Sequence, residues 1–246
     1  MKIIKLDATD STNTFLKELA QNSPLENYTT VVAREQNLGR GQMNNSWLSE
    51  PSKNLTFSIF NRFKRLPIEH QSYLNFSVSL ALLNTLKEMS VPNLKVKWPN
   101  DIMSGNQKIC GILVETTFKN LKIKNTVIGI GLNVHQEEFP SHISNASSLK
   151  NILHQEFDLD SILVKIVENI KVWIEKLENN QLETIDYEYH QHLYKKNVPT
   201  AFKNEKTELY FMGIIQGVSP QGNLRIQLED DSIAEYSIKE VSLAKV

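Results

Sequence analysis

The chain has 246 residues, of which 40% are hydrophobic and 22% charged, and its formal net charge is −1. This composition is typical of a soluble globular protein, and the length allows one well-buried core plus a small second domain. The balanced charge excludes the global basic field that drives non-specific nucleic-acid binding. The single cysteine, Cys110, excludes an internal disulfide and a multi-cysteine metal site, and it fits the reducing cytoplasm in which we expect the protein to act.

Two kinds of segment are not expected. No window reaches about 18 uninterrupted apolar residues, so we expect no membrane span. The N-terminal sequence MKIIKLDATDST has neither a long apolar stretch nor a small-residue cleavage site, so we expect no signal peptide.

The chain up to Pro199 mixes strand and helix patterns. Short alternating or β-branched runs predict strands, and apolar residues at helical spacing predict helices. The expected strands cover residues 1–6, 28–34, 55–61, 94–98, 108–117 and 122–133. The expected helices cover residues 14–21, 70–89, 162–177 and 184–194, and the polar stretch 35–47 is expected to be a loop.

The pattern changes after Pro199. Short alternating runs are separated by turn residues such as Pro220-Gln221-Gly222-Asn223, which predicts a small β-barrel. We therefore expect two domains, 1–196 and 197–246. The predicted fold class is α/β (α+β), with a mixed-sheet domain followed by the barrel.

A glycine-rich segment, Gly39-Arg40-Gly41-Gln42, precedes Trp47 in the expected loop. Glycines let the backbone approach a ligand closely, and an arginine between them can neutralise a carboxylate or phosphate through its fork of donors. The alternative is a surface loop with an incidental arginine.

A second segment, Lys97-Trp98-Pro99-Asn100-Asp101, directly follows an expected strand. Ligands often bind at strand ends in open α/β sheets, and a partly enclosed lysine there suits a developing phosphate charge. The alternative is a lysine whose apolar stem covers a core tryptophan.

Glycines also interrupt two expected strands, at Gly111 and at Gly129 and Gly131. A glycine inside a strand often marks close approach by a ligand or by another backbone, so these three are expected to form the floor of a pocket. A β-bulge or tight strand packing is the alternative.

Other chemistries fit poorly. The chain has no GxxxxGK[ST] phosphate loop, no GxSxG elbow and no HExxH pair. Cys110 lies in an apolar run, which is typical of a small core residue. The histidines are scattered, which argues against a histidine metal site; they are His70, His135, His142, His154, His190 and His192.

Taken in order, these segments resemble the biotin–protein ligase family. The matching elements are Ser11-Thr12-Asn13, Glu35-Gln36 before the glycine-rich loop and Trp47, the KWPND segment, residues 108–115 and residues 129–133, with residues 213–243 similar to the family's SH3-like barrel. The combination of KWPND with GRG-x5-W at this separation is highly specific. The resemblance implies a catalytic domain related to class II aminoacyl-tRNA synthetases.

The resemblance also implies an activity. Biotin and ATP form biotinyl-5′-AMP and pyrophosphate, and a lysine of a biotin carboxyl carrier protein, of acetyl-CoA carboxylase or a related carboxylase, then attacks the adenylate. ATP arrives with Mg²⁺, and no tightly bound protein metal is expected. No membrane or sequence-specific DNA binding is expected, because Ser11 leaves no room for the family's N-terminal DNA-binding domain. The protein is then the monofunctional kind, a monomer or a homodimer.

The resemblance assigns roles residue by residue. The residues implied to bind biotin are Ser11, Thr12, Asn13, Gln36, Arg40, Gly41, Gln42, Lys97 and Gly111. Those implied to bind ATP or the adenylate are Gly39, Arg40, Gly41, Trp47, Lys97, Asn100 and Asn133. Lys97 and Arg40 are implied to be catalytic, since they can neutralise the like charges that meet at the α-phosphate.

The loop departs from the family's usual GRGRxGRxW pattern. Gln42 stands where an arginine is frequent, and Asn44 and Asn45 stand where glycine and arginine are frequent. Loss of two positive charges predicts weaker retention of the adenylate, although Asn44 can tolerate left-handed backbone. The rival functions are a lipoate–protein ligase of the same superfamily and a non-catalytic biotin-binding module.

Overall fold

The structure, a computed structural model, describes residues 1–141, 143 and 145–244, without the side chain of Asn44. His142, one of the scattered histidines, lies outside the described residues, as do the last two residues of the expected second domain.

A mixed seven-stranded sheet forms the larger part of the described chain. Its strand order is β1-β2-β3-β7-β6-β5-β4; β1 and β2 run parallel, and every other neighbouring pair is antiparallel. In that order the strands are Ile3–Thr9, Thr29–Gln36, Leu55–Pro67, Lys122–Leu132, Gln107–Lys119, Asp101–Ser104 and Leu94–Lys97.

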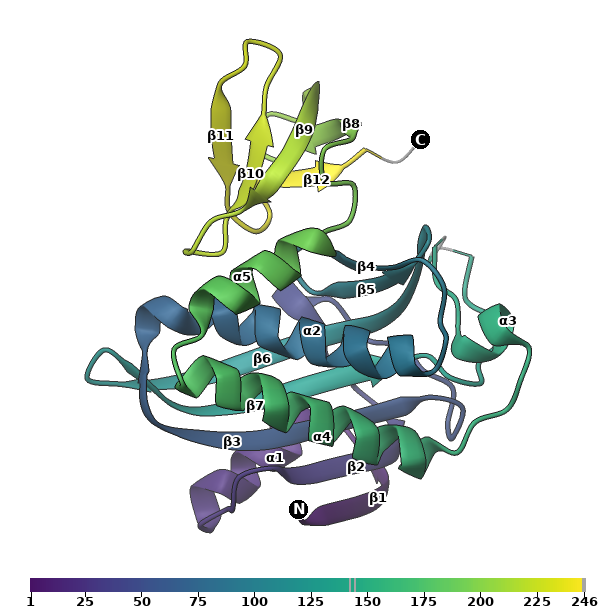
Figure 1. Cartoon of the computed structure of the whole chain (residues 1–246). Helices are drawn as coiled ribbons and strands as arrows, with labels where there is room; N and C mark the ends of the chain where they lie inside the picture. Colours follow the sequence, from purple (N-terminus) through teal and green to yellow (C-terminus); the bar gives the residue numbers. More distant parts are fainter. Residues whose placement is uncertain (142, 144, 245–246) are drawn as a thin grey trace.

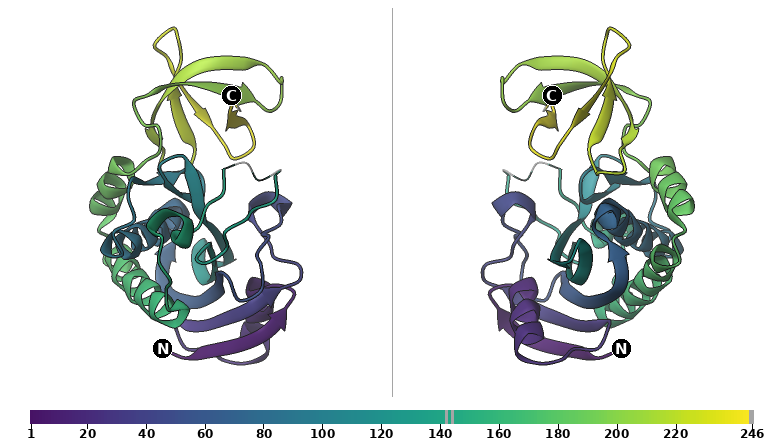
Figure 2. Two further views of the ribbon diagram at one scale, coloured as in Figure 1. Left: turned by 90° about the vertical axis from the view of Figure 1, so that its right-hand side faces the viewer. Right: turned by 90° about the vertical axis from the view of Figure 1, so that its left-hand side faces the viewer.

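Helices lie on both faces of this sheet (Figures 1 and 2). The helices α2 (Gln71–Glu88), α4 (Leu159–Glu178) and α5 (Leu182–Gln191) cover one face, and α1 (Thr12–Asn22) lies on the other. Three short helical segments connect these elements: η1 (Gln42–Asn44), η2 (Ile68–His70) and α3 (Leu149–Leu153). The expected α/β class follows from this layering.

The alternating sequence of strand β7 gives the two faces of the large sheet different side chains. Successive side chains of a strand point to opposite faces, so Ile128, Ile130 and Leu132 point one way and Gly129 and Gly131 the other. The three apolar side chains are at most 3% exposed and join the main core with α2 and α4. Gly129 and Gly131 contribute no side chains to the opposite face. They leave room there, next to the start of α1.

A second, five-stranded antiparallel sheet forms the C-terminal part, in the order β11-β10-β9-β8-β12. Its strands are Ile233–Tyr236, Leu224–Gln227, Tyr210–Val218, Pro199–Asn204 and Val241–Leu243. Phe202 and Ile226 are almost fully buried inside it. The expected small β-domain is therefore present, whereas the exact boundary near residue 197 stays a prediction.

One turn of this small barrel, residues 218–223, binds it to the larger part. The indole Nε1 of Trp98 donates to the carbonyl of Gly222 at 2.9 Å, and Nε2 of His190 accepts from the amide of Val218 at 2.9 Å. The hydroxyl of Ser72 donates to the carbonyl of Pro220. These bonds hold the barrel above the strands β4 and β5 (Figure 1).

Two elements differ from the sequence-based expectation. No strand is expected between the runs 94–98 and 108–117, but residues 101–104 form the strand β5, which pairs with β4 and β6. Helix α3 was not expected either; it is a single turn, too short to show a helical period. In the described residues, no helix is long and apolar enough to cross a membrane.

Candidate functional site

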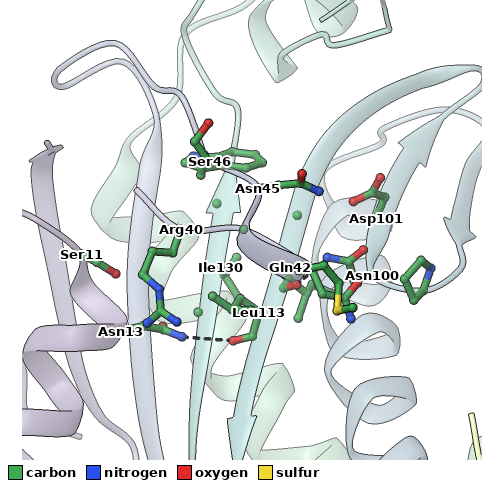
Figure 3. A pocket seen from close by; sticks show the side chains of 18 of the residues that line it. Ser11, Asn13, Arg40, Gln42, Asn45, Ser46, Asn100, Asp101, Leu113 and Ile130 are labelled. Atoms are coloured by element: carbon green, nitrogen blue, oxygen red, sulfur yellow. Dashed lines mark hydrogen bonds between the residues drawn. The ribbon is translucent and has the colours of Figure 1, made fainter. Parts of the chain in front are cut away.

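A cavity of about 430 Å³ lies on the glycine side of the large sheet. Its walls come from segments far apart in the chain: the start of α1, the end of β2, the loop 40–47, the strands β6 and β7, the segment 99–101, and Ile238 and Lys239 of the barrel. This volume is in the range of sites that hold a small organic molecule. Figure 3 shows the cavity from close by.

Polar side chains gather at the end of the cavity nearest α1. Thr12 and Asn13 are each 3% exposed, and Ser58 is fully buried beneath them. The hydroxyl oxygen of Ser58 lies 2.5 Å from Oδ1 of Asn13 and 2.7 Å from Oγ1 of Thr12. The backbone amide and the hydroxyl of Thr12 both donate to Oε1 of Gln36, at 2.8 and 3.1 Å. This network fixes the rotamers of a polar surface before any ligand arrives.

Ser11 differs from its neighbours at this end. It is the N-cap residue of α1, yet its side chain makes no capping hydrogen bond, and it is only 4% exposed. Its hydroxyl is not one of the fully buried unpaired groups in the described part of the chain, so it is open to the cavity. Its position on the cavity wall makes Ser11 a hydrogen-bonding group available to a ligand.

Glu115 organises the charges behind this polar end. Its carboxylate accepts from Nδ2 of Asn13 at 2.9 Å and from Nζ of Lys17 at 2.8 Å, and Nη2 of Arg40 lies 3.0 Å away. Burial acts to raise the pKa of this carboxyl, but the hydrogen bonds from Lys17 and Asn13, with the charges of Lys17 and Arg40, hold it below its usual value. Glu115 therefore stays ionised at neutral pH.

Arg40 consequently points to the same end of the cavity as Asn13 (Figure 3). Its guanidinium is 3.0 Å from Glu115 and 3.4 Å from the hydroxyl of Thr14, and its side chain is 45% exposed. The bond to Leu113 in the same view is donated by Nδ2 of Asn13, at 3.3 Å.

The two glycines of β7 each make room for one particular side chain. A Cβ added to Gly129 would overlap the amide of Asn13, and one added to Gly131 would overlap the indole of Trp47. Gly111 is the cross-strand partner of Gly131, and a Cβ there would lie 2.9 Å from the same indole. The glycines therefore form a floor that carries Asn13 at one end and Trp47 at the other.

A positively charged side chain lies over the ring of Trp47. The ammonium of Lys108 lies 5.6 Å from the centre of its ring, within the range of a cation–π contact, and 2.7 Å from the carboxylate of Asp101. The indole Nε1 is buried and has no acceptor within the part of the chain described.

The loop that carries Arg40 and Trp47 is closed by backbone hydrogen bonds. The amide of Trp47 donates to the carbonyl of Gly39 at 2.8 Å, and the amide of Gly41 donates to the carbonyl of Asn45 at 2.6 Å. The left-handed residue in this loop is Met43, with φ of 59°. Gln42 and Asn45, two of the departures from the usual loop pattern, both line the cavity.

The KWPND segment divides between two cavities. Asn100 donates through Nδ2 to the carbonyl of Ile112 at 2.8 Å and lines the smaller cavity, as do Pro99 and Asp101. Lys97 lines an adjoining cavity of about 950 Å³ beneath the barrel. The two cavities share Pro99, Asp101, Ile238 and Lys239, so they meet between the large sheet and the barrel.

Most of the site residues expected from the sequence come together here. The smaller cavity is lined by Ser11, Thr12, Asn13, Gln36, Arg40, Gly41, Gln42, Trp47, Asn100 and Gly111. Gly39 lines neither cavity, and its carbonyl accepts from the amide of Trp47; Lys97 lies in the adjoining cavity. Asn133 does not line either cavity; it is buried, and its Nδ2 donates to the carbonyl of Ser147 at 2.9 Å.

Several residues of the site were not expected. Ser58, Glu115 and Lys108 reach it because of strand register, and Lys239 reaches it because the barrel folds back over the sheet. The alternation of β3 signals that Ser58 shares a face with Gly129, its partner on β7. Nothing in the local sequence signals Lys239.

One other feature matches the sequence-based interpretation. Cys110 is fully buried, and burial raises the pKa of its thiol, as suits a core residue. Among the described residues, no group of three or more histidine, cysteine, aspartate or glutamate side chains could hold a metal ion.

The chain is similar in sequence to protein ligases. Residues 6–133 match the model of the biotin/lipoate A/B protein ligase family. The bifunctional ligase/repressor BirA of Bacillus subtilis is 30% identical over 168 residues, which are 67% of this chain and 51% of that protein. The biotin–[acetyl-CoA-carboxylase] ligase of Paracoccus denitrificans is 33% identical over 131 residues, which are 52% of this chain and 53% of that protein. The chain thus spans about half the length of these curated relatives.

A solved structure matches over a longer range. The biotin protein ligase of Aquifex aeolicus, in complex with biotin and ATP, is 26% identical and superimposes with a TM-score of 0.80, covering 100% of this chain and 99% of the other. This likeness confirms the expected fold class.

Proposed function

The chain belongs to the biotin/lipoate A/B protein ligase family, and from this premise we propose that it is an ATP-dependent biotin–protein ligase. The reaction has two steps. A carboxylate oxygen of biotin attacks the α-phosphorus of ATP, and pyrophosphate leaves with the electron pair of the broken bond. The amine of a carrier lysine then attacks the acyl carbon of biotinyl-5′-AMP; AMP leaves, the amine loses a proton, and an amide remains.

One observation supports this proposal most strongly. The glycine floor of the cavity carries polar side chains at one end and the indole of Trp47 at the other. Biotin has a ureido ring that needs donors and acceptors, and a chain that ends in a carboxylate. Thr12, Asn13 and Gln36 present fixed polar groups near α1, and Ser11 adds a hydroxyl that makes no capping hydrogen bond. We place the ureido ring there and the carboxylate toward Trp47.

The nucleotide then lies at the other end. Trp47 offers a flat aromatic face on Gly111 and Gly131, which suits a purine base, and Asn100 lies on the same wall. ATP arrives with Mg²⁺ on its phosphates, and the ion reduces their repulsion toward the incoming carboxylate. The metal thus belongs to the substrate.

Charge neutralisation is the main task of the protein in this reaction. A carboxylate must approach a phosphate, so positive groups near the meeting point lower the barrier. We assign this role to Arg40 and Lys97. Arg40 would leave its ion pair with Glu115 and bind the substrate anion instead, and Lys97 lies at the edge of the adjoining cavity. The loop 39–47 carries both Arg40 and Trp47, so it is suited to cover the adenylate and exclude water.

The proposed acceptor is a biotin carboxyl carrier protein, as in acetyl-CoA carboxylase. The experiment is to incubate the protein with ATP, Mg²⁺, biotin and a carrier domain and to measure the carrier's mass. We expect a gain of one biotin on one lysine, and no gain when lipoate replaces biotin. Transfer of lipoate to a lipoyl domain, with none of biotin, would move the assignment to the lipoate branch of the family. Biotin binding without transfer would indicate a binding module.

Lys97 provides the second arm of this experiment. Lys97→Ala removes the positive charge that we place near the α-phosphate, so the biotinylation rate should fall by roughly 100-fold or more. Lys2→Ala, at an exposed position that lines neither cavity, is the matched control and should keep the wild-type rate. Equal rates for the two variants would remove Lys97 from the mechanism.

A further inference from the structure

Lys239 belongs to the barrel, yet it lines both cavities at the place where they meet. We infer that its ammonium binds the β- and γ-phosphates of ATP and the pyrophosphate that forms from them. This inference rests on the proposed function, because it assigns the phosphate end of the same site.

Lys239 has a backbone conformation that favours glycine. Residues 237–240 form a turn between β11 and β12, closed by the amide of Glu240, which donates to the carbonyl of Ser237 at 3.1 Å. Lys239 is the third residue of this turn and has φ of 74°. A positive φ at that position is normally taken by glycine or asparagine, and a lysine there is strained.

The surrounding contacts hold the turn in this shape. The carboxylate of Glu240 accepts from the amide of Ser237 at 2.8 Å and is paired with the ammonium of Lys206. The carbonyl of Glu240 accepts from the amide of Glu205 at 2.9 Å. The turn is therefore fixed by interactions that do not involve the side chain of Lys239, so the conformation does not explain why a lysine is present.

The ammonium of Lys239 also has no partner among the described residues. Three cations line the smaller cavity within the described residues. Arg40 is paired with Glu115, and Lys108 is paired with Asp101. Lys239 makes neither a hydrogen bond nor an ion pair with any described residue, and it is exposed. An unpaired ammonium at the mouth of a cavity attracts an anion, and a lysine suits a phosphate as a point charge.

The adenylation step determines which anion Lys239 would bind. Biotinyl-5′-AMP keeps only the α-phosphate, whereas pyrophosphate must leave the smaller cavity. The opening that Lys239 shares with Pro99 and Asp101 leads to the larger cavity, where Lys97 lies. Lys97 belongs to the large sheet and Lys239 to a turn of the barrel, so the β- and γ-phosphates would lie between the large sheet and the barrel. ATP binding would then fasten the barrel to the site.

The test separates charge from backbone strain. Lys239→Gly removes the charge but suits the positive φ, and Lys239→Arg keeps the charge. Asn180→Gly is the control for glycine in a left-handed turn, because Asn180 has φ of 58° and lines neither cavity. For each protein we would measure the KM for ATP, inhibition by pyrophosphate, the affinity for biotinyl-5′-AMP and the melting temperature.

We expect Lys239→Gly to raise the KM for ATP and the inhibition constant of pyrophosphate by roughly tenfold, the usual size of one charged hydrogen bond. Its affinity for biotinyl-5′-AMP and its KM for biotin should stay at the wild-type values, and its melting temperature should not fall. Lys239→Arg should stay within about twofold of the wild type, since the charge remains. Asn180→Gly should leave all four quantities unchanged.

Three results would overturn the inference. One is an unchanged KM for ATP in Lys239→Gly, and another is an equal loss of affinity for biotinyl-5′-AMP, which would place Lys239 on the α-phosphate or the base. The third is a rise in KM for the carrier alone, which would assign Lys239 to acceptor docking. A wild-type protein that fails to adenylate biotin would instead contradict the proposed function, so the two failures are distinguishable.

Discussion

The side-chain amide of Asn13 fills the space in which a Cβ on Gly129 would lie. Asn13 is held there by three neighbours: its Nδ2 donates to Glu115 and to the carbonyl of Leu113, and its Oδ1 lies against the hydroxyl of Ser58. A residue at the start of α1 is thereby fixed to a strand more than a hundred positions later. This contact shapes the polar end of the cavity.

Gly129→Ala should therefore impair biotin binding. The added methyl must displace Asn13, which breaks the network with Ser58, so we expect the KM for biotin to rise by roughly 30-fold or more, about 2 kcal/mol. The KM for ATP should change little. Titration calorimetry with biotin checks the first effect, and adenylation kinetics check the second; unchanged biotin affinity would contradict the placement of the ureido ring.

Gly131→Ala should produce the converse result. Its methyl would overlap the indole of Trp47, so the platform that we assign to the purine must shift. We expect a KM for ATP raised by about tenfold, the size of a stacking contact of roughly 1.5 kcal/mol, with the KM for biotin nearly unchanged. Circular dichroism should show the wild-type fold in both alanine variants. If each variant impaired both substrates equally, the two ends of the cavity would not be separate.

Glu115 should act on biotin by positioning Asn13. Glu115→Ala removes an acceptor of Nδ2, so the KM for biotin should rise several-fold, whereas Glu115→Gln keeps an oxygen there and should retain most of the affinity. Asp160→Asn breaks an exposed ion pair with Lys5 and serves as a control, with an expected effect near zero. A role of Glu115 in overall stability alone would lower the yield of both variants without this difference in KM.

The same carboxyl predicts a pH dependence of stability. Its pKa in the folded chain is lower than usual, so the folded state favours the ionised form and gains stability above the unfolded pKa of about 4.3. That gain is lost as the pH falls through the lower folded pKa. The difference in unfolding free energy between the wild type and Glu115→Gln should thus be constant from pH 6 to 8 and shrink below about pH 4. Denaturant titrations at several pH values measure it, and a difference that grows in acid would have the wrong sign.

Cys110 should take no part in the reaction. It is fully buried, and burial raises the pKa of its thiol, so little thiolate forms at neutral pH. A thiol reagent should modify it only after denaturation, and Cys110→Ala should keep the wild-type rate of adenylation. Rapid modification of the native protein with loss of activity would contradict this.

The sequence predicts those parts of the site that depend on local pattern. Gly129 and Gly131 alternate with apolar residues, which already indicates a strand with one bare face, and the loop from Gly39 to Trp47 stands out by composition. Residues that depend on register or on long-range folding could not be predicted. Lys239 reaches the cavity because the barrel lies against the larger part of the chain, to which the turn 218–223 is hydrogen-bonded.

The strand β5 shows a related limit. It has four residues and begins with Asp101, so its short pattern does not differ from that of a loop. Its pairing with β4 places Lys97 opposite Asp101 and divides the KWPND segment between two cavities. The residue types of that segment predict a phosphate site, but only the folded sheet determines which cavity each residue lines.

The central claim is that this cavity joins biotin to AMP, and exchange of labelled pyrophosphate into ATP tests it without a carrier protein. We predict exchange that depends on biotin, is absent with lipoate and falls sharply in Gly129→Ala. Exchange that needs no biotin, or that occurs with lipoate alone, would contradict the account, as would a complete lack of exchange by folded protein that binds both biotin and ATP.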